Sequence, residues 1–493
     1  MKRKRLKINE LLSLLFLLIS LQSIFAQSKA GELKVEPFIF EAGNGSKIEA
    51  ERGFVSVPEN RQKPNSRLIE IGFVRFKSTS PNPKSPVVYL AGGPGSSGIG
   101  TARGSRFPLF MAMREVADVI ALDQRGVGQS KPNLNCKETI NYPLEETPNR
   151  EGFAAHFQEK FQSCIDNFRK QDVDLSGYNT NENADDIEDL RKAIAAKQIS
   201  LWAISYGTHL SLATVKRHPK SIDRMILAGV EGLSDTLKLP SNIQKHLDYL
   251  DQLAKKDADL SREIPSLLSL MKTVLDKVER EPVTIETTDP QTKQKVKVTI
   301  NKFVLQMLTG NSFGSGEASI PQIYQAMSRG DFSFAVFRWL SLTRGGQGIG
   351  SAMSLMMDCA SGISSKRRQQ IAREAKTTLL GDVMNFPFPD VCKGFENVDL
   401  GEKFRAPVKT NIPTLFISGT LDVRTPVSNA ENVRKGFKTS EHLIIEGAVH
   451  SDPLFLSSPK IKDVMLEFMK GQKISTNKIS LEPLKFAQIS NKN

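Results

Sequence analysis

Residues 199–207, Ile-Ser-Leu-Trp-Ala-Ile-Ser-Tyr-Gly, decide the fold of this chain. The first four residues predict a buried strand, and residues 208–218 predict a helix. Ser205 therefore stands on a tight turn from strand to helix, with small residues, Ala203 and Gly207, two positions to either side. Such a turn strains the backbone of the serine and exposes its hydroxyl, so its neighbours must be small. A nucleophilic serine is the prediction, although Ala203 replaces the more usual glycine.

Two further residues have the placement that a reactive serine requires. A serine hydroxyl becomes a good nucleophile when a histidine takes its proton and a carboxylate orients that histidine. Asp422 follows a predicted strand at 413–418, and His450 follows another at 442–445. Sites in open α/β sheets form at the carboxyl ends of strands, and of the six histidines His450 alone has this position. The chain order Ser205, Asp422, His450 predicts a catalytic triad.

A glycine loop predicts where the oxyanion would bind. Residues 91–98, Ala-Gly-Gly-Pro-Gly-Ser-Ser-Gly, follow a predicted strand at 87–90. Acyl transfer places negative charge on the carbonyl oxygen, and backbone N–H groups stabilise that charge. We expect one donor to be the N–H of Tyr206, directly after the serine, and the other to be the N–H of Gly93.

The same loop also matches a dinucleotide-binding fingerprint, with glycines at 93, 95 and 98 and an acid, Asp123, after a later strand. Three features oppose that alternative. Pro94 removes an N–H that would face phosphate. Residues 124–130 form a glycine-punctuated loop rather than a simple turn, and the N-terminus directs the chain out of the cytosol, where such cofactors are found. We expect no cofactor.

Three motifs together carry a family resemblance. They are the Gly-Gly-Pro-Gly loop at 92–95, the Asp-Gln-Arg-Gly-x-Gly-x-Ser run at 123–130 and the Ser-Tyr-Gly turn at 205–207. In combination they resemble the proline iminopeptidase family of serine aminopeptidases. The chain length, a large insertion and the cysteine placement are more similar to its tripeptidyl aminopeptidase branch. The resemblance runs from about residue 35 to residue 470, with Ala91 where the family often has histidine.

The resemblance implies an α/β-hydrolase fold, and the alternation of predicted strands and helices independently favours a mostly parallel sheet covered on both faces. A helix-rich insertion precedes the strand that carries Asp422, and this position favours a cap over the site rather than an independent binding domain. A hairpin-like pair of strands, at 283–287 and 295–300, is expected within it on either side of Asp289-Pro290. The expected divisions are a signal peptide at 1–26, the N-terminal part of the core at 27–230, a mainly helical cap at 231–410, the C-terminal part of the core at 411–471 and a polar tail at 472–493.

The N-terminus and the cysteines predict an exported protein, periplasmic or secreted. Residues 1–26 combine basic residues with a short apolar run, as in a cleavable signal, and no later segment could cross a membrane permanently. Four cysteines in an exported chain favour two disulfides, with three possible connectivities. Nearest-neighbour pairing is preferred and agrees with the resemblance, which implies Cys136–Cys164 and Cys359–Cys392. No metal-ligand spacing occurs, so no metal site is expected.

The predicted activity is removal of residues from the amino end of peptides. An aminopeptidase must bind a cationic amino terminus, so a carboxylate beside the site is expected. The candidate is Glu231, at the junction of core and cap. The alternative is that Glu231 is only a solvated acid at this junction. An esterase or lipase-like hydrolase with the same triad is the main alternative. An inactive binding protein on this scaffold is a remote one.

Nucleic acid is not an expected partner, because the net charge of +13 forms no basic stripe with aromatics. The sequence does not predict the oligomeric state.

Overall fold

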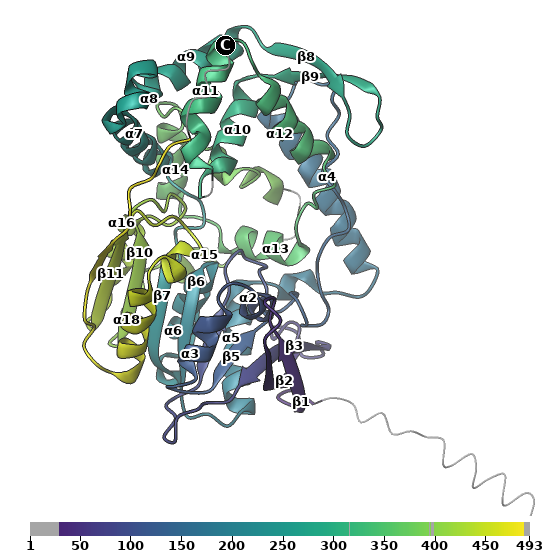
Figure 1. The fold of residues 1–493 in the computed structure, drawn as a ribbon. Helices are drawn as coiled ribbons and strands as arrows, with labels where there is room; N and C mark the ends of the chain where they lie inside the picture. The colour runs from purple at the N-terminus through teal and green to yellow at the C-terminus, as the bar shows by residue number, and fades with distance from the viewer. Residues whose placement is uncertain (1–28, 315, 394, 396–398, 488–493) are drawn as a thin grey trace, which may run out of the picture.

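One twisted sheet forms the centre of the molecule (Figure 1). The computed structural model describes residues 29–314, 316–393, 395 and 399–487, so the predicted signal at 1–26 lies outside the described residues. In these residues ten strands pair in the order β1-β2-β3-β5-β4-β6-β7-β10-β11-β12. The strands are β1 Leu33–Glu41, β2 Lys47–Pro58, β3 Leu68–Phe76, β4 Val87–Leu90, β5 Val119–Leu122, β6 Ile199–Ser205, β7 Ile222–Val230, β10 Thr414–Gly419, β11 Ser440–Glu446 and β12 Lys478–Ser480.

The sheet is mostly parallel. β1, β2, β3 and β5 pair antiparallel in turn, and every pairing from β5 across to β12 is parallel. All residues of β4, β5 and β10 are buried, which explains why these strands read as unbroken apolar runs. The predicted mostly parallel α/β sheet is confirmed.

Helices cover both faces of the sheet. Successive residues of a strand point to opposite faces, so Trp202 and Ile204 of β6 pack in one apolar cluster while Leu201 and Ala203 pack in another. On the Trp202 face lie α2 Gly98–Arg103, α3 Phe107–Met113, α17 Pro453–Leu456 and α18 Pro459–Lys470. On the Ala203 face lie α5 Thr180–Ala193, α6 Tyr206–Arg217 and α16 Val427–Arg434. This double cover is the predicted α/β-hydrolase architecture.

The insertion between β7 and β10 stands above one edge of the sheet in Figure 1 and is mainly helical. Its hairpin of β8 Val283–Thr288 and β9 Lys295–Ile300 agrees with the strand pair that the sequence predicts on either side of Asp289-Pro290. Its helices are α7 Pro240–Lys256, α8 Ala258–Glu263, α9 Leu267–Arg280, α10 Lys302–Ser312, α11 Ile320–Ser328, α12 Ser333–Arg344, α13 Ala352–Ser361, α14 Ser365–Glu374 and α15 Gly401–Arg405.

One helix from outside the insertion packs with it. α4 Arg150–Arg169 belongs by sequence to the predicted core segment 27–230. Its Phe153 ring nevertheless lies 5.2 Å from Trp339 and 5.3 Å from Phe386, measured between ring centroids. An aromatic face of this kind is buried only against other apolar side chains, and the insertion supplies them. The cap is therefore built from two separate parts of the chain.

The C-terminal tail, predicted as a polar segment at 472–493, also joins core and cap. β12 adds a parallel strand beside β11, and Leu484 and Phe486 pack against the larger apolar cluster. The N–H of Ala487 donates to the carbonyl of Ala318 at 2.9 Å. Figure 1 shows this yellow segment rising from the sheet to the helices above. None of the helices in the described residues has both the length and the apolarity needed to cross a bilayer.

Candidate active site

Ser205 ends β6 in a strained backbone conformation, with φ 56° and ψ −127°, and α6 begins at the next residue. The turn depends on close backbone approach. A Cβ added to Gly207 would lie 2.2 Å from the carbonyl oxygen of Leu90, and one added to Gly92 would lie 2.9 Å from Cβ of Ser205. No side chain fits in these distances, so both glycines are required. Ala203 is fully buried in the core, which accommodates its methyl group.

Asp422 and His450 are hydrogen-bonded to each other. Nδ1 of His450 donates to Oδ2 of Asp422 at 2.8 Å. The Thr425 hydroxyl donates to the same oxygen at 2.6 Å, and the Thr425 N–H donates to Oδ1 at 2.8 Å. Burial opposes ionisation of Asp422, but the positive charge and hydrogen bond of His450, with those of Thr425, outweigh it and hold the pKa below its usual value. A buried carboxylate that stays ionised can orient the histidine.

Thr425 is a residue that sequence reasoning missed. It lies three positions after Asp422, where a side chain and an N–H can both reach back to the carboxylate. The Asp-x-x-Thr spacing of such a turn is the signal that could have identified it.

Ser205 and His450 line one cavity of about 430 Å³ together with Gly92 and Gly93. The hydroxyl of Ser205 and the ring of His450, both described residues, are not hydrogen-bonded to each other. In enzymes without substrate this contact is often long, and it shortens when substrate binds. The three residues predicted as a triad thus lie at one edge of the sheet, with the Asp–His pair already made.

The two predicted oxyanion donors also lie beside Ser205. Gly93 has φ +114°, and a Cβ there would lie 2.8 Å from the N of Gly95. Tyr206 is the first residue of α6, where N–H groups have no partner within the helix. Its side chain is buried and points into the protein, with its hydroxyl 3.0 Å from Oγ1 of Thr180. Only the backbone of Tyr206 is therefore available to a substrate.

One face of helix α13 in the cap packs against residues near Ser205. The Ser354 hydroxyl donates to the carbonyl of Pro94 at 2.7 Å, Sδ of Met357 lies 3.3 Å from the Tyr206 hydroxyl, and the Ser361 hydroxyl lies 3.2 Å from Nε2 of His209. Positions 354, 357 and 361 fall on one side of an α-helix. Position 358 belongs to the same side of α13, so Asp358 also faces these residues near Ser205.

Asp358 is the acid of this region that has no partner. It is only partly exposed, and its carboxylate makes no hydrogen bond or ion pair with any other described residue. Burial, and then the negative charge of Glu231, raise the pKa of Asp358 well above its usual value, while Lys238 opposes the shift. The sequence offered no signal for this residue, because its role depends on where α13 lies.

Glu231, the acid predicted to meet a substrate amino group, directly follows β7 and is 5% exposed. Nζ of Lys238 donates to its carboxylate at 2.6 Å, and Nδ1 of His209 lies 3.9 Å away. The structure thus gives Glu231 a cationic partner within the protein. The carboxyl group of Asp358 is the one left without a hydrogen-bonded or ion-paired partner among the described residues.

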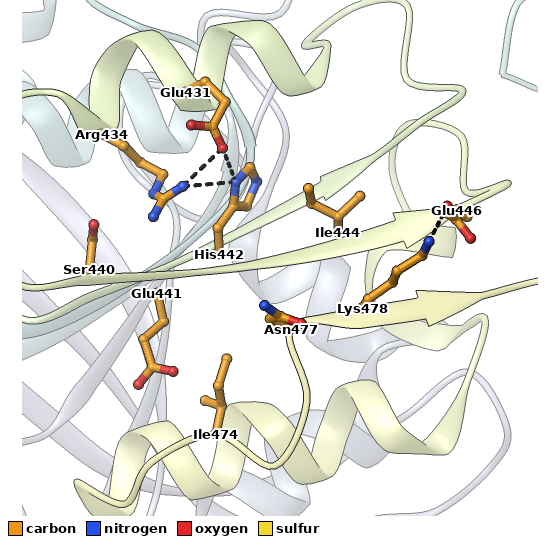
Figure 2. Close-up of a pocket in the computed structure, with 10 residues that line it drawn as sticks. All are labelled: Glu431, Arg434, Ser440, Glu441, His442, Ile444, Glu446, Ile474, Asn477 and Lys478. Atoms are coloured by element: carbon orange, nitrogen blue, oxygen red, sulfur yellow. Dashed lines mark hydrogen bonds and ion pairs between the residues drawn. The ribbon is translucent and has the colours of Figure 1, made fainter.

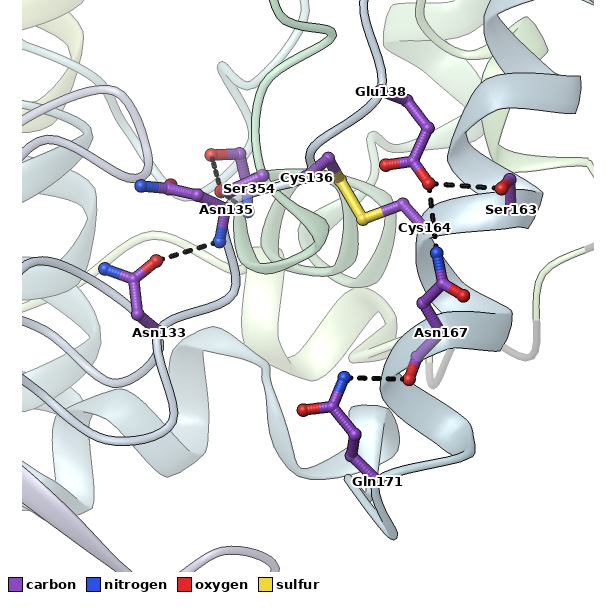
Figure 3. Close-up of a disulfide and its surroundings, with 10 residues drawn as sticks. Asn133, Asn135, Cys136, Glu138, Ser163, Cys164, Asn167, Gln171 and Ser354 are labelled. Atoms are coloured by element: carbon purple, nitrogen blue, oxygen red, sulfur yellow. Dashed lines mark hydrogen bonds between the residues drawn. A yellow bond between two sulfur atoms is a disulfide. The ribbon is translucent and has the colours of Figure 1, made fainter.

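One disulfide anchors α13 directly, and the other lies beside the segment that leads into it. Cys136 bonds Cys164 of α4, and Cys359 of α13 bonds Cys392, which is the pairing implied by the resemblance. Beside the first disulfide, drawn in Figure 3, the Cys136 N–H donates to the carbonyl of Gly350 at 3.0 Å, just before α13 begins. A group with the spacing of metal ligands also lies here, made up of Cys136, Glu138 and Cys164. Its two sulfurs are bonded to each other in the disulfide, so this group is not read as a metal site.

A second serine, histidine and acid are hydrogen-bonded together, and two of them, His442 and Glu431, line the pocket of Figure 2. Nε2 of His442 is 3.0 Å from the Ser418 hydroxyl, and Nδ1 is 2.6 Å from Oε1 of Glu431. Burial lowers the pKa of His442. Ser418 is fully buried within β10, so no substrate can reach its hydroxyl. Access as well as geometry favours Ser205 as the nucleophile.

Comparisons with known proteins agree with this architecture. Residues 85–278 match the family model described as the α/β hydrolase fold, and residues 381–478 match the one described as TAP-like protein. The chain is 30% identical over 190 residues to YuaR of Escherichia coli, named as a hydrolase, which is 37% of this chain and 36% of that protein.

Two peptidases are also similar. Over 186 residues the chain is 30% identical to serine protease Hip1 of Mycobacterium tuberculosis, covering 36% of this chain and 35% of that protein. Over 232 residues it is 25% identical to tripeptidyl aminopeptidase of Streptomyces coelicolor, covering 42% and 41%. The matched stretch spans only about a third to two fifths of the length of these relatives.

Proposed function

We propose that this chain, which has the α/β-hydrolase fold, is an exported serine peptidase that removes residues from the free amino end of peptides. The single observation that carries the proposal is the buried Asp422–His450 pair, whose histidine lines the same cavity as Ser205. The similarity to a serine protease and to a tripeptidyl aminopeptidase supports peptides as the substrate class.

The proposed reaction is acyl transfer in two steps. Ser205 attacks the scissile carbonyl while His450 takes its proton, and Asp422 holds the resulting imidazolium. The backbone N–H groups of Gly93 and Tyr206 stabilise the negative charge on the carbonyl oxygen. His450 then gives the proton to the leaving amine as the peptide bond breaks. Water, activated by the same histidine, releases the acyl product and restores Ser205.

The uncompensated acid of α13 supports recognition of an amino terminus. A terminal ammonium group beside Asp358 would supply the positive charge that this carboxylate lacks within the protein. The charge of Glu231 acts on Asp358 and strengthens the negative potential, although Lys238 offsets part of it. We assign the direct contact to Asp358 and the supporting role to Glu231.

Export rests on two features that point the same way. The basic and apolar residues at 1–26 predict a secretory signal. The two disulfides support an oxidising compartment, such as the periplasm or the exterior, because such bonds rarely persist in the cytosol.

A substrate panel with Ser205→Ala tests the function. We expect wild-type protein to cleave tripeptidyl or aminoacyl anilides with a free amino group, and Ser205→Ala to lose at least about a thousandfold in kcat/KM with an unchanged thermal transition. Acetylation of the substrate amino group should abolish cleavage. Equal cleavage of acetylated peptides would contradict an exopeptidase, and turnover of simple esters alone would identify an esterase.

A further inference from the structure

The cavity beside Ser205 opens toward the face of the sheet that carries α2 and α3. Its wall includes Tyr89 and Ile204, which pack in the apolar cluster of that face. Tyr206, next to Asp358, packs in the cluster of the opposite face. Ser205 therefore has this cavity on one side, while the next residue, Tyr206, contacts α13 on the other through its hydroxyl and Met357.

Most of the charge in the cavity is internally balanced. Arg106 is 5% exposed, and its Nε donates to Asp452 at 2.7 Å while its Nη1 donates to the Tyr89 hydroxyl at 2.7 Å. A third donor, Nη2, reaches the Ser451 hydroxyl at 3.3 Å. Because Arg106 and Asp452 neutralise each other, neither attracts a charged ligand strongly.

Arg424 is the exception. It lines the same cavity and is exposed, and its guanidinium makes no hydrogen bond or ion pair with another described residue. Only its backbone is fixed, through its N–H to Oδ1 of Asp422 at 3.0 Å. The loop that orients His450 thus also presents an uncompensated cation to the cavity.

The chemistry of the proposed reaction identifies the occupant of the cavity. His450 must return its proton to the leaving amine, so the leaving part of the peptide lies beside the His450 ring. That ring lines this cavity, and its volume of about 430 Å³ is within the usual range for small-ligand sites. A leaving group of a few residues would end in a carboxylate close to the cavity wall.

We propose that Arg424 binds the C-terminal carboxylate of the leaving peptide and thereby makes short peptides with a free carboxyl end the preferred substrates. The inference rests on the peptidase function proposed above. A guanidinium matches a carboxylate through two parallel hydrogen bonds, and the absence of an internal partner leaves that fork available. Arg424 is then a specificity residue for the leaving side, while Asp358 acts on the amino side.

The test compares paired peptides that share the best acyl part and differ only in ending as a carboxylate or an amide. Leaving groups of one, two and three residues are included. For wild-type protein we expect kcat/KM to be about tenfold higher for the acid at the length that reaches Arg424. Arg424→Gln should remove the preference, and Arg424→Lys should retain part of it. Added salt should weaken it, because exposed ion pairs are screened.

Two controls separate this inference from the function on which it rests. Aminoacyl anilides have no leaving carboxylate, so the rate at which Arg424→Gln cleaves them is the reference against which its acid and amide rates are compared. Arg103→Gln removes an exposed arginine of α2 outside the cavity wall and should leave the preference intact. Equal cleavage of acid and amide at every length, or an unchanged preference in Arg424→Gln, would overturn the role of Arg424 alone. No cleavage of any peptide would overturn the proposed function itself.

Discussion

At the scale of single residues, the charge state of Asp358 links stability to recognition. Its pKa is raised by burial and by the negative charge of Glu231. A folded state that holds this proton more tightly than the unfolded chain gains stability at low pH. That stability is fully present below the usual carboxyl pKa near 4 and is lost as pH rises through the raised value. Ionisation of Asp358 therefore costs stability, which is common for groups retained for function.

Asp358→Asn should separate these two effects. We expect a higher free energy of unfolding than wild type at pH 7 and no gain at pH 3, where the native carboxyl is already protonated. For peptides with a free amino end, kcat/KM should fall about tenfold and lose its dependence on Asp358 ionisation at the acidic side of the pH profile. Denaturant titrations at both pH values and rate profiles provide the measurements.

A matched variant completes that experiment. Asp259→Asn removes a carboxylate of the cap that is 95% exposed and should change neither quantity appreciably. If Asp358→Asn were destabilising at pH 7 while activity was retained, Asp358 would have a structural role and not one in recognition.

The site residues differ in how far sequence could predict them. Ser205, Asp422 and His450 each follow a strand, so local pattern and chain order were sufficient to propose them. Asp358 and Arg424 were identified because their side chains have no hydrogen-bonded or ion-paired partner among the described residues. Whether a charged side chain lacks a partner depends on tertiary packing, so no local sequence pattern indicates it.

At the scale of elements, α13 has a covalent link near its end, through Cys359, and a disulfide-bonded segment hydrogen-bonded just before its start, through Cys136 and Gly350. The disulfides close loops with sequence separations of 28 and 33 residues. Loop-closure entropy predicts about 3 to 4 kcal/mol of stabilisation from each. Because α13 carries Asp358 and contacts the glycine loop through Ser354, loss of a link should also disturb the site.

Replacing both Cys359 and Cys392 by serine should therefore lower the free energy of unfolding by about 3 kcal/mol. It should also lower kcat/KM for free-amino peptides more than for aminoacyl esters of comparable reactivity. The matching pair at Cys136 and Cys164 serves as comparison, since its disulfide lies at the other end of α13. Unchanged stability under reducing and oxidising conditions would contradict a structural role for these bonds.

Some elements were predictable and others were not. The β8–β9 hairpin was foreseen because alternating residues flank a turn at Asp289. β12 was not, because three residues gain strand structure only from pairing with β11. The packing of α4 with the cap was also missed, since the partner of Phe153 lies almost two hundred residues further along the chain.

At the scale of the whole molecule, the tail connects sheet and cap. A protein ending at Gly471 loses β12 and the buried contacts of Leu484 and Phe486. At about 1.5 to 3 kcal/mol for a fully buried side chain, and less for these partly buried ones, we expect a loss of about 2 to 4 kcal/mol. Thermal unfolding measures it, with a chain ending at Ala487 as the control. A truncated protein as stable as the control would contradict the role assigned to the tail.

The general architecture followed from the order of strands and helices. Parallel strands joined by helices must be covered on both faces, so the sheet and its layers were predictable. How the cap meets the sheet was not, because this depends on contacts between residues distant in sequence, as with Ser354 and Pro94.

The last strand and the final hydrogen bond of the described chain limit how far the molecule can open. Residues 481–487 connect Ser480 in the sheet to Ala318 in the cap, and seven extended residues reach at most about 25 Å. While Ala487 stays attached, this tether restricts the gap between sheet and cap on its side. An extended peptide end is narrow enough to enter such a gap, whereas a folded protein is not. The size of acceptable substrates would then be set mechanically, independently of any residue that recognises them.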